Sequence, residues 1–212
     1  MSDQIKDSTI FAFSEALASK APAPGGGGAA AVASALAAAL GSMAANLTIG
    51  KKKYAAIESE LIQKRDAADM LRLRLLALAD ADAEAFLPLS QAYSLPAGAE
   101  EEKARKADVM EQALVAACEV PLEIMARCAD AIVLIDWIAG HCSPLVVSDA
   151  AAAAALGEGA LKAASLNVYI NAKSMADREA AGRYTDRADA ILAEYEAMAA
   201  KVFHEVKDVL CT

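Results

Sequence analysis

The sequence predicts an all-α protein, a compact multi-helix bundle built around a long buried alanine-rich central helix. Hydrophobic residues make up 57% of the 212 residues but aromatic residues only 5%, so alanine supplies much of the apolar count. Small side chains allow helices to approach one another closely. Runs of β-branched residues, which favour strands, are scarce, whereas good helix formers dominate. No internal repeat or linker divides the chain, so we expect residues 1–212 to form a single domain.

The stretch of residues 21–54 is central to this prediction. It opens with two prolines and four consecutive glycines, which disfavour a helix: Gly25, Gly26, Gly27 and Gly28. Apolar residues at helical spacing then predict one face of a long helix: Val32, Leu36, Leu40, Met43 and Leu47. We therefore expect a glycine loop that leads into a helix N-terminus, where free backbone N–H groups can bind an anion or the polar edge of a flat ring. A flexible hinge that only caps the helix is the alternative.

A short helix is expected before the glycines. Ile10, Phe13 and Leu17 recur at helical spacing, and Ser8 is placed to cap the helix N-terminus. Pro22 ends the pattern. We expect the apolar face of this helix to pack on the core.

Helical patterns fill the rest of the chain. One runs from about residue 54 to residue 89, and another starts near Glu100. Pro121 interrupts the second pattern and is expected to be the first residue of a new helix. Residues 140–147 are interpreted as a loop. The last helix, from about Asp177, carries an apolar stripe that is either a packing surface or a dimer surface.

Three acidic residues, Asp80, Asp82 and Glu84, lie near the end of the pattern of residues 54–89. Asp82 shares a helix face with apolar neighbours: Leu75, Leu78, Ala79, Ala85 and Phe86. Glu84 instead shares a side with Asp80 and is expected to be solvated. A carboxylate on an apolar face is costly unless it is paired, protonated or used, and its desolvation raises the pKa toward neutrality. Asp82 is therefore the predicted catalytic residue, and a buried acid bonded to a neighbouring helix is the alternative.

Two amides share one face of a later predicted helix. Asn167 and Asn171 lie four residues apart on the helix of residues 150–171, which Ser148 and Asp149 are expected to cap. Paired amides can recognise the donor and acceptor edge of a flat heterocycle, and they can equally cross-link two helices. We regard Asp149 as a cap that is also a candidate second acid.

Composition and spacing argue against several classes of function. A formal net charge of −9 argues against a nucleic-acid partner. The uncharged run of residues 21–50 is long enough to span a membrane, but its glycines, hydroxyls and alanines make it only weakly apolar. We therefore expect no membrane association, and the absence of a signal pattern predicts a cytoplasmic protein. The four cysteines lack paired spacing, so structural thiols and no metal site are expected: Cys118, Cys128, Cys142 and Cys211.

Five motifs together resemble the cyclodeaminase/cyclohydrolase family of folate enzymes. They are Pro24-Gly25-Gly26-Gly27-Gly28, Asn46-Leu47-Thr48, Gly50-Lys51-Lys52-Lys53-Tyr54, the run Asp80 to Phe86, and Asn167-Val168-Tyr169-Ile170-Asn171. The motifs follow the family's order and span nearly the whole chain. The resemblance implies that Asp82, the second Asp of its motif, is the catalytic residue. His141 stands where family members usually have Asn in a shorter loop, which makes the ligand contacts of this loop uncertain.

The resemblance implies chemistry on the one-carbon bridge between N5 and N10 of tetrahydrofolate. We favour a methenyltetrahydrofolate cyclohydrolase, which opens 5,10-methenyltetrahydrofolate to 10-formyltetrahydrofolate. A formiminotetrahydrofolate cyclodeaminase, which releases ammonia, and a non-catalytic helical interaction module are the alternatives. Both reactions need proton transfer and neither needs a metal or other cofactor. The family also implies a homodimer, with the site shared between subunits as one arrangement.

Three lysines follow the central helix, Lys51, Lys52 and Lys53. One interpretation is a solvated cluster that offsets the helix dipole. The other is that they bind the carboxylates of a glutamate or polyglutamate tail on the folate, which an acidic protein could not otherwise hold. The glycine loop, Asn167 and Asn171 are then expected to orient the pterin.

Overall fold

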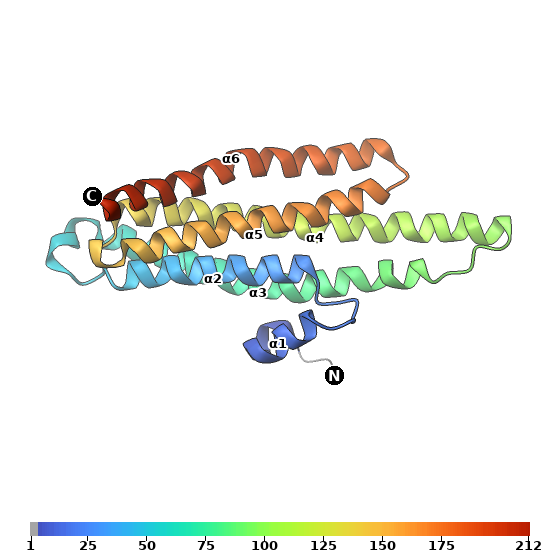
Figure 1. Cartoon of the computed structure of the whole chain (residues 1–212), viewed down its shortest axis with the longest axis horizontal. Coiled ribbons are helices and arrows are strands. Elements are labelled where there is room, and N and C mark those ends of the chain that lie inside the picture. The colour runs from blue at the N-terminus through green and yellow to red at the C-terminus, as the bar shows by residue number, and fades with distance from the viewer. Residues whose placement is uncertain (1–3) are drawn as a thin grey trace.

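The computed structural model describes residues 4–212 and confirms the all-α bundle (Figure 1). The helices are α1 (Ile10–Leu17), α2 (Gly26–Asn46), α3 (Glu58–Tyr93), α4 (Glu100–His141), α5 (Val147–Ser174) and α6 (Arg178–Cys211). Within these residues, the 3-10 helix η1 (Ile5–Asp7) precedes α1, η2 (Lys52–Ile57) joins α2 to α3, and η3 (Pro144–Val146) joins α4 to α5. No strand occurs in this described part of the chain.

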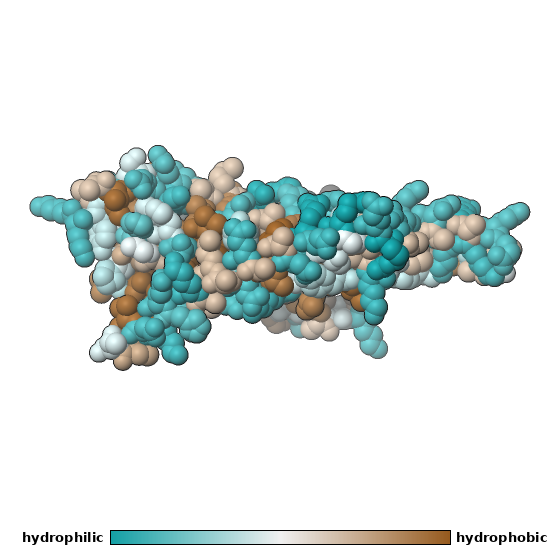
Figure 2. All heavy atoms as spheres, turned by 90° about the horizontal axis from the view of Figure 1, so that it is seen from above, coloured by the Kyte–Doolittle hydropathy of each residue, from teal (hydrophilic) through white to brown (hydrophobic). Residues whose placement is uncertain are grey.

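Helices α2 to α6 lie side by side along the long axis of the molecule and alternate in direction, as short connections require (Figure 1). α2, α4 and α6 run toward the end that holds the C-terminus, and α3 and α5 run back. The hairpin of α3 and α4 extends beyond the other helices, and this tapered end is mostly hydrophilic in Figure 2. α1 lies apart, beneath the start of α2.

Small residues make the core around α2. Its buried side chains are all glycine, alanine or serine, whereas Leu36 is 51% and Leu47 is 49% exposed. The central helix is therefore buried and alanine-rich as predicted, but only part of its predicted apolar stripe packs on the core, namely the half-buried Val32 and Leu40. A Cβ added to Gly41 would lie 3.2 Å from Ile135 of α4, which shows how closely the helices approach. A helix that is buried through small side chains does not show the periodic spacing of large apolar residues in its sequence.

Three expectations about helix ends were wrong. Gly26, Gly27 and Gly28 form the first turn of α2, and only Gly25 lies outside it as the N-cap. Pro121 lies inside α4, which continues unbroken from Glu100 to His141. Asp149 lies in the first turn of α5 and does not cap it, because the helix already begins at Val147. Tertiary packing overrides the local cost of glycine in the first turn of α2 and of proline inside α4.

The first helix, α1, differs from its prediction in both its cap and its packing. Thr9, not Ser8, caps α1 by accepting a hydrogen bond from the backbone N–H of Ala12 at 3.1 Å. None of its residues is buried, and Ile10 and Phe11 are 85% and 72% exposed. The predicted packing of this helix on the core is therefore wrong for the single chain.

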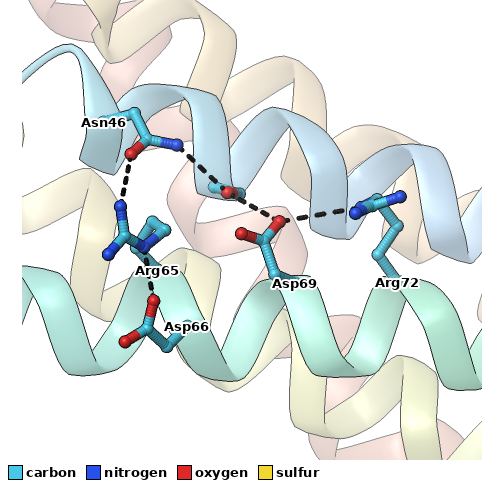
Figure 3. A network of polar contacts seen from close by, with 6 residues as sticks. Asn46, Arg65, Asp66, Asp69 and Arg72 are labelled. Carbon is cyan, nitrogen blue, oxygen red and sulfur yellow. Dashed lines mark hydrogen bonds and ion pairs between the residues drawn. The ribbon is translucent and has the colours of Figure 1, made fainter.

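A polar network fastens the C-terminal half of α2 to α3 (Figure 3). Ser42 donates to Asp69 Oδ1 at 3.0 Å, and Arg65 Nη1 donates to Asn46 Oδ1 at 2.8 Å. Arg72 forms an ion pair with the same Asp69 oxygen at 3.6 Å. Asn46, which belongs to one of the family-like motifs, therefore has a structural role at the end of α2 opposite the glycines.

Two helical segments are long and apolar enough to cross a membrane by length and composition, Gly26–Asn46 and Pro144–Ser174. Both pack against other helices of the bundle, and 61% of the apolar window in the first is buried. Core helices commonly meet these criteria. The absence of membrane association stays a prediction.

Candidate active site

The carboxyl group of Asp82 lies at the N-terminus of α2. α3 presents this side chain to the first turn of α2, where the backbone N–H of Gly28 donates a hydrogen bond to it. A Cβ added to Gly27 would overlap the Asp82 carboxylate oxygens. The glycines therefore let a carboxylate approach the helix backbone, and at least one of the free N–H groups expected to face a ligand binds Asp82 instead.

Burial and the α2 backbone act on Asp82 in opposite directions. Desolvation is the larger effect and raises the pKa of this carboxyl above its ordinary value of 3.8, while the hydrogen bond from Gly28 lowers it. Desolvation disfavours the charged form, and a donor at a helix N-terminus favours it. The balance produces a carboxylate that is fixed in position and more basic than a solvated aspartate, which suits a group that accepts and returns a proton.

The raised pKa predicts how stability depends on pH. Between pH 3.8 and the raised value, the folded protein binds the Asp82 proton more tightly than the unfolded chain does. Stability from this group is present at low pH and is lost as pH rises through that window. Asp82→Asn should therefore gain stability relative to the wild type over the window, as measured by urea unfolding at a series of pH values. A stability difference between Asp82→Asn and the wild type that does not change with pH, or that becomes less favourable to the variant as pH rises, would contradict this assignment.

The other two acids of the motif have different surroundings. Asp80 accepts a hydrogen bond from the backbone N–H of Ile5 at 2.5 Å and so fastens η1 to α3. Glu84 is exposed, as predicted. Of these three carboxylates, Asp82 alone faces the glycines and the pocket beside them.

Asn167 and Asn171 lie on α5 and face the same pocket as Asp82. The Nδ2 group of Asn167 donates to the Ala163 carbonyl at 2.9 Å, and Nδ2 of Asn171 donates to the Ala117 carbonyl of α4 at 2.7 Å. Each amide nitrogen is therefore held by a backbone oxygen. The Oδ1 atoms and the remaining N–H of each amide stay available to a ligand.

These groups surround a pocket of about 230 Å³. Apart from Gly25, Gly26, Asp82 and the two asparagines, its walls are mostly apolar: Pro22, Ala23, Ala85, Phe86, Ala117 and Ile170. Asp82 is the only charged side chain among the lining residues. Sequence reasoning missed Phe86 as a site residue, although it lies four residues after Asp82 on the same helix face. Such a pocket favours a flat, largely apolar ring with a few polar edges.

Within one chain, the lysines lie far from this pocket. α2 has 21 residues, so its two ends are about 30 Å apart. Lys51, Lys52 and Lys53 follow its C-terminal end, and the glycines are at its N-terminal end. Asp149 also lies near the lysine end, in the first turn of α5. The structure therefore does not bring the lysines or Asp149 to Asp82 in the single chain.

His141, which replaces the Asn of the family pattern, lies at the same distant end. Its ring stacks on Trp137 with centroids 4.1 Å apart, and Nδ1 lies 2.7 Å from the Trp137 carbonyl oxygen. The ring is therefore held against its own helix.

Comparison with known proteins identifies the family. Residues 9–190 match the family described as formiminotransferase-cyclodeaminase. A methenyltetrahydrofolate cyclohydrolase from Methylorubrum extorquens is 41% identical over 95% of this chain and 97% of its own. The chain belongs to the formiminotransferase-cyclodeaminase family.

Other members show how the family varies. The formimidoyltransferase-cyclodeaminase of Mus musculus is 32% identical over 92% of this chain, which spans only 36% of the mouse protein. A crystal structure of a formiminotetrahydrofolate cyclodeaminase from Thermotoga maritima superposes with a TM-score of 0.80, at 29% identity, over 96% of both chains. The family thus includes proteins named for both reactions, and the common fold does not separate them.

Proposed function

We propose that the protein is a methenyltetrahydrofolate cyclohydrolase, which hydrolyses 5,10-methenyltetrahydrofolate to 10-formyltetrahydrofolate. The observation that carries this assignment is the desolvated Asp82 carboxylate, held by the first turn of α2 inside a ring-sized apolar pocket. The 41% identical relative that bears this activity in its name supports the cyclohydrolase over the cyclodeaminase. The mouse and Thermotoga maritima proteins named as cyclodeaminases are 32% and 29% identical.

Asp82 moves the proton in this proposal. The methenyl carbon is part of a cationic amidinium between N5 and N10, and a desolvated carboxylate stabilises that charge. As water adds to the carbon, Asp82 accepts one of its protons and a tetrahedral carbinolamine forms. Asp82 then returns the proton to N5 as the bond between this carbon and N5 breaks. The carbinol O–H gives up its proton to solvent as the formyl C=O forms on N10, and no cofactor takes part.

The pocket encloses only part of the substrate. Its volume of about 230 Å³ is below the ~300–1,000 Å³ typical of sites that bury a drug-sized ligand. We propose that the pterin and the one-carbon bridge occupy it. The Oδ1 atoms of Asn167 and Asn171 accept hydrogen bonds from the pterin N–H groups, and Phe86 packs on the ring. The aminobenzoylglutamate part then leaves across the rim near Ile170, which is 60% exposed.

A direct assay tests the function. Purified protein is supplied with 5,10-methenyltetrahydrofolate in one cuvette and 5-formiminotetrahydrofolate in another, and the methenyl absorbance is followed in both. The cyclohydrolase predicts a fall in the first. A rise in the second, with release of ammonia, would assign the cyclodeaminase. No change beyond the buffer rate in either cuvette would leave the non-catalytic interaction module as the better account.

We further propose that the working form is a homodimer in which each pocket uses the lysines of the other subunit. A two-fold axis near the middle of α2 would bring the lysine end of one copy to the glycine end of the other. Leu36, halfway along α2, is 51% exposed and would lie at such an interface. Lys51, Lys52 and Lys53 would then bind the glutamate or polyglutamate tail. The cytoplasmic location stays a prediction.

Replacing the three lysines together by alanine should raise KM several-fold for a polyglutamylated substrate and less for the monoglutamate. Charge-assisted contacts to each tail carboxylate are lost, and the wild-type advantage should shrink at high salt. Steady-state kinetics at two ionic strengths measures this.

A subunit-mixing experiment tests whether the lysines act across subunits. The triple lysine variant and Asp82→Asn are mixed in equal amounts and allowed to exchange subunits. The mixed dimers should regain one site with the wild-type KM. That site combines Asp82 of one copy with the lysines of the other. A mixture that shows only the raised KM would contradict the shared site.

A further inference from the structure

Pro121 leaves one backbone oxygen of α4 without its helical partner. In an α-helix the carbonyl of residue i accepts from the N–H of residue i+4, and proline has no N–H. Because Pro121 lies inside α4, the carbonyl of Ala117 lacks its intrahelical donor. This oxygen belongs to a residue that lines the pocket.

Asn171 is the donor that replaces the missing one. Its Nδ2 group lies 2.7 Å from the Ala117 oxygen, across the packed interface between α5 and α4. A buried carbonyl strongly prefers to keep a hydrogen-bond partner, so the bond fixes both the position of the amide and its orientation. With Nδ2 directed to α4, the acceptor Oδ1 is the free end of the amide in the pocket.

We propose that Pro121 is a positioning residue for the active site, because it frees the Ala117 carbonyl to anchor the Asn171 amide. The inference rests on the proposed function in one respect only, the identity of the ligand. The Asn171 amide is taken to bind the polar edge of the folate ring. Pro121 itself is buried and does not line the pocket. Its effect on the substrate therefore passes through Asn171.

Pro88 of α3 provides a matched control. It also lies inside a helix, but it is exposed, and the carbonyl that it frees belongs to the exposed Glu84. Among residues 4–212, no side chain donates a hydrogen bond to the Glu84 carbonyl. Pro88→Ala therefore restores a helical N–H without competing for any site residue.

The test is a double-mutant cycle with Pro121→Ala and Asn171→Ala. Restoring the N–H at position 121 makes it compete with Asn171 for the Ala117 oxygen. Pro121→Ala should therefore lower kcat/KM by about three- to tenfold, the usual range for one hydrogen bond. The same change should have little effect in the Asn171→Ala background, and Pro88→Ala should leave kcat/KM unchanged. Equal losses from Pro121→Ala in both backgrounds, or no loss in either, would overturn the proposal.

Unfolding of the same four proteins gives a readout that does not depend on activity. Asn171→Ala should lower the urea midpoint in the wild type, because it leaves the Ala117 carbonyl unpaired. In the Pro121→Ala background the new N–H satisfies that carbonyl, so the fall should become smaller. An equal fall in both backgrounds would overturn the anchoring. Absence of turnover in the wild type would instead count against the proposed function alone.

Asn171→Asp covers the case in which Pro121→Ala does not fold. Aspartate keeps the shape and an acceptor toward the pocket, but it cannot donate to the Ala117 oxygen. The variant should lose at least as much kcat/KM as Asn171→Ala. Wild-type kcat/KM in Asn171→Asp would show that donation to α4 is not needed and would overturn the proposal.

Discussion

Asp82→Asn should lower kcat for methenyltetrahydrofolate by about 10²- to 10⁴-fold, the usual contribution of a positioned general acid or base. Asparagine keeps the size of the side chain and can still accept from the Gly28 N–H, but it cannot carry the proton. KM should change little, because the amide occupies the same volume in the pocket. Steady-state kinetics, with circular dichroism to check the fold, measures the effect.

Glu84→Gln is the matched control for this substitution. It makes the same chemical change on the same helix, on an exposed side chain that does not line the pocket. We expect its kcat to equal that of the wild type. Comparable turnover in Asp82→Asn and Glu84→Gln would remove Asp82 from the mechanism.

Gly27→Ala should be almost as damaging, although it adds a single methyl group at a residue that carries no side chain. A Cβ there would overlap the Asp82 carboxylate, so the carboxyl group must rotate away from the Gly28 N–H. Misplacing a catalytic group by about 1 Å can reduce the rate by ~10²-fold. Elsewhere in a helix the same substitution usually stabilises by about 0.5–1 kcal/mol.

Gly159→Ala separates the clash from the general effect of alanine in a helix. Gly159 is exposed on α5, and a Cβ there meets no atom within 4 Å. It should leave kcat unchanged and raise the melting temperature slightly. The Gly27→Ala change should also add little loss in the Asp82→Asn background, because both act on one group. If the losses of kcat from Gly27→Ala and Asp82→Asn multiplied in the double variant, Gly27 would act on a group other than Asp82.

Helical periodicity predicted the part of the site that depends on helix faces. Asp82 lies among apolar neighbours on α3, and Asn167 and Asn171 lie on one face of α5, so spacing alone placed each on the correct side of its helix. Periodicity does not say what a face meets. Asp82 can reach the first turn of α2 only because residue 27 is glycine and has no Cβ in the way. This requirement becomes visible only when α3 is packed beside α2.

The wrong prediction at Pro121 has a clear physical cause. Pro121 was predicted to begin a helix because interior prolines are costly, but a side chain on another helix satisfies the freed Ala117 carbonyl, a compensation that local sequence does not show. The glutamate-tail interpretation of Lys51, Lys52 and Lys53 stays a prediction, because the single chain shows only that they lie far from the glycines. The 21-residue length of α2 alone separates them by about 30 Å.

α1 shows a different limit. Its apolar residues have the spacing of a packed helix, yet Ile10 and Phe11 remain exposed in the single chain. An amphipathic pattern predicts that a face will be covered, but it does not identify the surface that covers it.

The pH dependence of kcat/KM tests most directly whether a desolvated Asp82 moves the proton. The account predicts that the wild type loses activity at low pH with a single ionisation above the ordinary aspartate value of 3.8, and that this ionisation is absent from the residual activity of Asp82→Asn. A wild-type profile with no such ionisation, or the same ionisation in the variant, would contradict the account.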